Sequence, residues 1–127
     1  MNIFGIGTDI VSVDRIKDSL KNKNFINRIF NKKEILRCKT ISNSINCYAK
    51  RFAAKEAFSK ALGTGISSGI NFNEIIILNK KSGKPYISVI GQTKITLKKK
   101  LKRKKSKISL SLSDEKKYAV AFVTISI

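Results

Sequence analysis

Few residues in this chain could carry chemistry, because it contains no histidine and only eight acidic residues. Histidine is the commonest general base and metal ligand, so catalysis here has to rest on carboxylates, lysines, hydroxyls or a metal-held water. Two carboxylates stand out by position. Asp9 lies near the end of a glycine-containing apolar segment, and Glu56 lies inside a long helical pattern.

Glu56 falls in the middle of an apolar helix face, between Ile45, Ala49 and Phe52. An isolated ionised carboxylate in such a place is strongly disfavoured, so we expect Glu56 to face a cleft with a cationic partner, either a metal ion or Lys60. The alternative is an ordinary Glu-to-Lys i,i+4 helix pair, which contributes about 0.2–0.5 kcal/mol.

Asp9 has its own simpler interpretation as a turn-forming or capping residue. Taken together with Glu56, however, it offers hard oxygen ligands with no soft ligand beside them. Mg²⁺ typically takes one or two protein carboxylates and completes its shell with water and substrate phosphates. The pair therefore predicts a magnesium site that handles a phosphate-containing ligand.

The elements that must position these residues follow from hydrophobic periodicity and turn signals. We predict helices from the Ser12 cap through Leu20, from the Asn31/Glu34 capping box through Cys38, over 44–62 ending at Gly63, and over 93–107. We predict strands over 3–11, 75–78, 86–90, 108–112 and 118–127, with the second and third joined as a hairpin. The 19-residue segment 44–62 becomes the central helix.

Length and composition indicate one globular domain over 1–127, with no run long enough to span a membrane and no secretory signal. We therefore expect a cytoplasmic protein whose two cysteines, Cys38 and Cys47, are buried or idle thiols. The net charge of +19 suits an anionic partner, although a lysine-rich genome bias explains it equally well. The lysine run 98–105 offers a nucleic-acid-binding alternative, but no aromatic residues interleave with it to stack on bases.

The motifs resemble the bacterial holo-acyl-carrier-protein synthase family, the small trimeric phosphopantetheinyl transferases. The resemblance is carried by four segments: 5–11 (GIGTDIV) leading to Arg15, 51–66 (RFAAKEAFSKALGTGI), 82–85 (SGKP), and 111–115 (SLSDE) with Tyr118. It implies the α+β 4′-phosphopantetheinyl transferase fold, an antiparallel sheet with a long central helix, assembled as a homotrimer. It also implies transfer of the phosphopantetheine arm of coenzyme A to a serine of acidic apo-acyl carrier protein. Carriers of polyketide or peptide synthesis are an alternative partner.

By the same resemblance, Asp9 and Glu56 hold Mg²⁺ on the diphosphate of coenzyme A, Lys60 lies against the phosphates, and Arg15 meets the carrier protein. The implied coenzyme A contacts, in clefts between adjacent subunits, are Arg51, Ser59, Lys60, Gly63, Thr64, Gly65, Lys84, Pro85 and Lys117. Lys117 departs from the family pattern, because many members have a histidine there. A lysine can still contact a phosphate as a point charge.

Overall fold

The computed structural model describes residues 1–65 and 69–127. Its helices are α1 (Val13–Ser19), α2 (Lys23–Ile29), α3 (Lys32–Thr40), α4 (Ser44–Leu62) and α5 (Gly91–Lys100), with a 3₁₀ turn at Phe72–Glu74. Its strands are β1 (Ile3–Ser12), β2 (Ile75–Asn79), β3 (Pro85–Val89), β4 (Lys107–Asp114) and β5 (Tyr118–Ser126). These elements form the α+β architecture that the sequence predicts.

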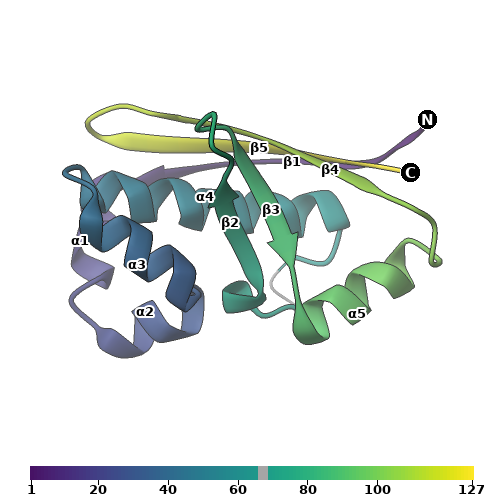
Figure 1. The fold of residues 1–127 in the computed structure, drawn as a ribbon, viewed down its shortest axis with the longest axis horizontal. Coiled ribbons are helices and arrows are strands. Elements are labelled where there is room, and N and C mark those ends of the chain that lie inside the picture. The colour runs from purple at the N-terminus through teal and green to yellow at the C-terminus, as the bar shows by residue number, and fades with distance from the viewer. Residues whose placement is uncertain (66–68) are drawn as a thin grey trace.

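An antiparallel sheet of order β1-β5-β4 lies along one side of the central helix α4 (Figure 1). Helices α2 and α3 lie on the other side of α4 from this sheet, whereas the separate β2–β3 hairpin runs beside α4, where β3 contacts β4. The core forms where α4 meets the sheet. Small side chains let the two layers approach closely, and those that are fully buried include Ala49, Ala53, Ala57, Ala119 and Ala121.

Most element predictions are confirmed. Helix α4 has the predicted bounds, and Gly63 ends it with a φ of 84°, a left-handed conformation that favours glycine. Ser12 caps α1 by accepting a hydrogen bond from the Arg15 amide, and the Asn31/Glu34 capping box starts α3. The predicted hairpin is β2–β3.

Two element predictions were wrong. The sequence analysis missed α2, whose residues 23–29 lie in a segment without a recognised motif. The helix predicted over 93–107 ends at Lys100, because Lys102 and Arg103 turn into left-handed conformations and the Arg103 amide bonds back to the Lys98 carbonyl. The chain then re-emerges as β4 from Lys107.

The prediction for the cysteines was also wrong. Cys38 near the end of α3 and Cys47 in the first turn of α4 form a disulfide and are not free thiols. Hydrophobic periodicity says nothing about pairing between two cysteines that become neighbours only when α3 folds back on α4.

Candidate active site

Two glycines of β1 bring this strand directly onto α4. A side chain at Gly5 would overlap the carbonyl oxygen of Ala61, and one at Gly7 would overlap the carbonyl oxygen of Ala57. Alternate residues of a strand face the same side, so Asp9 points toward α4 as these glycines do. The glycines are therefore what allows a strand carboxylate to reach the side chains of the helix.

Asp9, Glu56 and Lys60 meet in one cavity of about 420 Å³, which we call the carboxylate cavity. The Lys60 Nζ lies 3.3 Å from Asp9 Oδ1 and donates a hydrogen bond of 3.0 Å to the Thr8 carbonyl. Within the described residues, Lys60 thus pairs with the strand acid and forms no ion pair with Glu56. The structure brings the three predicted residues together and does not form the simple i,i+4 helix pair.

The electrostatics of this cavity leave its negative charge incompletely balanced. Burial raises the pKa of Asp9, and the hydrogen bond and charge of Lys60 act in the opposite direction. Burial also raises the pKa of Glu56, and the neighbouring Asp9 carboxylate raises it further. Two partly buried carboxylates with raised pKa values and one lysine beside them form a site that a further cation would stabilise.

The donor chemistry fits the magnesium that the resemblance implies. Asp9 and Glu56 supply hard oxygen ligands, and the cavity leaves room for water and phosphate oxygens beside them. The described residues contain no group of three or more acidic or sulfur ligands.

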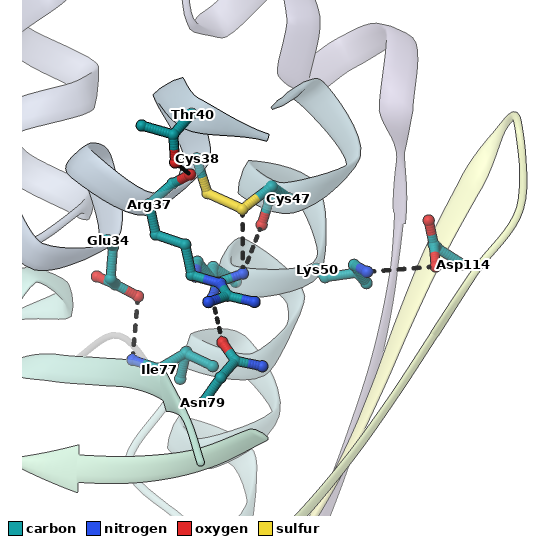
Figure 2. The surroundings of a disulfide bond; sticks show 10 residues. Glu34, Arg37, Cys38, Thr40, Cys47, Lys50, Ile77, Asn79 and Asp114 are labelled. Carbon is teal, nitrogen blue, oxygen red and sulfur yellow. Dashed lines mark hydrogen bonds and ion pairs between the residues drawn. A yellow bond between two sulfur atoms is a disulfide. The ribbon is translucent and has the colours of Figure 1, made fainter. Parts of the chain in front are cut away.

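Arg51 and Pro85 line a different cavity of about 240 Å³, together with Asn79, Gly83 and Cys47. We call it the Arg51 cavity. The Arg51 guanidinium is 3% exposed, donates to Asn79 Oδ1 at 2.8 Å, and also donates to the carbonyl and sulfur of Cys47. Its Nε has no hydrogen-bond partner among the described residues. Figure 2 shows the surroundings of this cysteine between α3, α4 and Asn79.

The other predicted coenzyme A contacts lie at several places. Gly63, Thr64 and Gly65 follow the end of α4, and the last residue of the 51–66 signature lies, with residues 67 and 68, outside the described residues. Lys84 and Lys117 are exposed in the β2–β3 and β4–β5 turns. Neither the carboxylate cavity nor the Arg51 cavity includes any of these five residues.

Ser59 lies inside the fold. Its side chain is completely buried, and its hydroxyl donates to the Lys55 carbonyl one turn earlier on α4. Its contact with coenzyme A stays a prediction.

Arg15 is exposed on α1 and lines the rim of the carboxylate cavity. A partner that approaches α1 would therefore also reach the cavity. The cavity wall includes Phe25 of α2, which stacks on Phe52 of α4 with ring centroids 6.1 Å apart. Sequence reasoning missed Phe25, because it lies in the segment whose helix was not predicted.

Sequence reasoning also missed the buried ion pair of Glu34 and Lys55. The two side chains are fully buried, and Lys55 Nζ lies 2.7 Å from Glu34 Oε1 while also donating to the carbonyls of Phe72 and Ile75. Glu34 Oε2 accepts from the Ile77 amide (Figure 2). The ion pair and its hydrogen bonds therefore connect α3, α4 and β2. The sequence assigned Glu34 only to the capping box of α3, although the same glutamate also forms this ion pair.

No helix among the described residues is long and apolar enough to cross a membrane.

Comparison with known proteins gives consistent matches along the chain. The family model of the 4′-phosphopantetheinyl transferase superfamily matches residues 5–123. A holo-[acyl-carrier-protein] synthase of Pelagibacter ubique is 52% identical over 125 residues, covering 98% of each chain.

Solved structures give the same result. The holo-[acyl-carrier-protein] synthase of Neisseria meningitidis aligns with a TM-score of 0.88 at 40% identity, covering 98% of this chain and 99% of that one. The enzyme of Bacillus anthracis, solved in complex with CoA (3′,5′-ADP), aligns with a TM-score of 0.81 at 35% identity, covering 98% and 97%. These comparisons give no support to the nucleic-acid-binding alternative.

Proposed function

Because the chain belongs to the 4′-phosphopantetheinyl transferase superfamily, we propose that it transfers the phosphopantetheine arm of coenzyme A to a serine of apo-acyl carrier protein. This is the activity of the holo-[acyl-carrier-protein] synthases that it matches over nearly its full length. The serine hydroxyl attacks the β-phosphorus, the bond to the leaving phosphate breaks, and adenosine 3′,5′-bisphosphate departs. The observation that carries the proposal is the meeting of Asp9, Glu56 and Lys60 in one cavity.

In this proposal, Asp9 and Glu56 would hold Mg²⁺, which when bound neutralises charge on the phosphate oxygens. Lys60 already lies at the cavity and adds a positive charge for the leaving phosphate. Either Glu56 or a water held by the cation would accept the serine proton. Asp9 is tied to Lys60, so it is the weaker candidate for that step.

We propose that the working unit is a homotrimer. The inward residues of β5 pack on α4, so its other face points away from the core. That outer sheet face exposes large apolar side chains, with Ile6 61%, Ile10 63%, Tyr118 46% and Phe122 41% exposed. Contiguous exposed apolar surface of this kind is typical of a protein interface.

The trimer would also explain why the predicted contacts fall into two groups. The carboxylate cavity holds the phosphate-handling residues, whereas the Arg51 cavity holds Arg51 and Pro85. We propose that the Arg51 cavity of one copy faces the carboxylate cavity of the next, so that one coenzyme A molecule contacts both. Lys84 and Lys117, which lie in exposed turns, would then reach the nucleotide phosphates.

Arg15 and the surrounding basic surface are the proposed contact for the acidic carrier protein. The chain carries 27 lysine and arginine residues against eight acidic residues, so an acidic partner is attracted at long range. Arg15 lies at the rim of the carboxylate cavity, so a carrier docked there would present its serine to the site. The cytoplasmic location stays a prediction.

The test incubates the protein with coenzyme A, Mg²⁺ and apo-acyl carrier protein and follows the mass of the carrier. We expect the wild-type protein to add one phosphopantetheine arm, and we expect Asp9→Asn and Glu56→Gln to lose the activity while staying folded. The matched control is Asp18→Asn, which neutralises an exposed carboxylate that lines neither cavity and should keep wild-type rates. Wild-type rates in either cavity variant would refute the site.

A further inference from the structure

The disulfide between Cys38 and Cys47 forms part of the wall of the Arg51 cavity. Cys47 lines this cavity, and its sulfur and carbonyl oxygen accept hydrogen bonds from Arg51 Nη1 at 3.2 and 3.3 Å. Cys38 is completely buried on the other side of the bond, and Cys47 is 4% exposed. Figure 2 shows the bond joining α3 to α4 beside the residues that hold Asn79 and Ile77. The disulfide therefore contacts Arg51, a residue to which the proposed function gives a role in binding coenzyme A.

We propose that this disulfide is a thiol-exchange site whose redox state sets the affinity of the Arg51 cavity for its nucleotide ligand. The inference rests on the proposed function, because it takes the adenosine 3′,5′-bisphosphate part of coenzyme A as that ligand. Intracellular disulfides are uncommon in mesophiles, and those that occur are mostly transient or redox-sensing. A pair with one sulfur on a ligand cavity matches that use better than a purely structural role.

The exchange requires a dithiol as the co-reactant. A thiolate of the dithiol attacks the Cys47 sulfur, the disulfide breaks, and its electron pair goes to the Cys38 sulfur, which takes up a proton. The second thiol of the dithiol then displaces Cys47, which leaves as a thiolate and is protonated in turn. In total the protein disulfide gains two electrons and two protons, and the dithiol becomes a disulfide. Arg51 lies beside the departing Cys47 sulfur, and a neighbouring cation stabilises a thiolate.

Reduction should change the shape of the cavity. Two thiols have to separate to van der Waals contact, and Cys38 is completely buried in the close-packed interior, so we expect the separation to move the backbone. The Glu34–Lys55 pair holds the start of α3 in place, so the movement falls on its C-terminal end and on the connection to α4. That connection contributes Ile41 and Asn43 to the cavity wall.

The coupling between the redox state of the disulfide and nucleotide binding is reciprocal. If the oxidised form binds the nucleotide more tightly, the bound nucleotide must favour the oxidised form by an equal factor. A ligand in the cavity also covers the approach to the Cys47 sulfur. Nucleotide binding should therefore slow reduction as well as oppose it.

The experiment compares oxidised and fully reduced wild-type protein in titrations with adenosine 3′,5′-bisphosphate, followed by calorimetry. Alkylation and mass measurement define the two forms: the oxidised chain takes no alkyl group and the reduced chain takes two. We expect the reduced form to bind about fivefold more weakly, at the lower end of common coupling factors. The Cys38→Ser/Cys47→Ser variant is the matched control, and it should bind like the reduced form whether or not dithiothreitol is present. Saturating nucleotide should also slow the reduction of the wild-type disulfide.

Affinities that agree within about twofold in the two redox states, well below that coupling range, would overturn the inference and leave the proposed function intact. An unchanged reduction rate at saturating nucleotide, or two alkylated cysteines after oxidation, would also overturn it. Failure of the nucleotide to bind either form would refute the nucleotide site of the proposed function, and the inference with it. If the serine variant does not fold, the comparison of the two wild-type forms decides alone.

Discussion

Substitution of Gly7 by alanine tests the close approach of β1 to α4 on which the site depends. The added Cβ would lie 2.7 Å from the Ala61 amide nitrogen and closer still to the carbonyl oxygen of Ala57. Both atoms belong to the helix backbone, so no side chain can rotate away. We expect β1 to be pushed off α4 locally, which separates Asp9 from Glu56.

The size of the effect follows from the geometry. Overpacking a close-packed core costs about 1–3 kcal/mol, and backbone neighbours place Gly7→Ala near 3 kcal/mol. Unfolding entropy is about 2.1 cal/mol/K per residue, so for 127 residues it is about 0.27 kcal/mol/K. The melting temperature should therefore fall by about 11 °C. Transfer activity should be lost as well, even at temperatures where the variant is folded.

The assay is thermal unfolding at fixed protein concentration, because the proposed homotrimer would make the melting temperature concentration-dependent. Gly83→Ala is the control: nothing lies within 4 Å of its added Cβ, and its φ of 94° isolates backbone strain. That strain should cost only about 1 kcal/mol, or about 4 °C. A Gly7→Ala protein that melts within about 2 °C of wild type and keeps its activity would refute the reasoning.

Three further predictions concern charged residues. Lys55→Met should cost about 3 kcal/mol in urea unfolding, because the carboxylate of Glu34 stays buried without its cation. Burial lowers the pKa of Lys55 from 10.5 to about 8. The unfolded chain therefore binds this proton more tightly than the folded chain does. As the pH rises from 8 to 10.5, the wild-type protein should gain stability relative to Lys55→Met. Glu56→Gln should melt about 2 °C higher than wild type at pH 7. The gain should vanish in acid, because the pKa of Glu56 is raised and its ionised form is unfavourable only above that pKa. A loss of stability of this variant at pH 7 would contradict the prediction. Lys60→Ala should slow transfer about 10²-fold. Its melting temperature should change by less than about 4 °C, because exposed ion pairs contribute at most about 1 kcal/mol. A lower melting temperature with an unchanged transfer rate would contradict the prediction.

Much of the fold was predictable because its signals are local. The bounds of α4 follow from an apolar pattern that ends at a glycine, and the caps of α1 and α3 follow from side chains within three residues of the helix start. The meeting of Asp9 with Glu56 was predictable for a related reason. A carboxylate on an apolar helix face needs a cleft and a counter-charge, and the glycines of β1 allow a close approach.

The rest depends on contacts between distant segments. Cys38 and Cys47 pair only because α3 packs on α4, and Glu34 meets Lys55 only after β2 covers both. The complete burial of Ser59 is likewise a property of the packed layers, which a signature in the sequence does not show. The spacing of residues along the chain does not show which residues of distant segments will meet, or which side chains will be buried.

A crystal structure of the protein with coenzyme A and Mg²⁺ is the most direct test of the central claim. The account predicts one divalent cation that takes oxygens from both Asp9 and Glu56 and from the diphosphate of coenzyme A. It also predicts that the adenine end reaches the Arg51 cavity of a second copy. A diphosphate bound away from both carboxylates, or a cation held without either of them, would contradict the account.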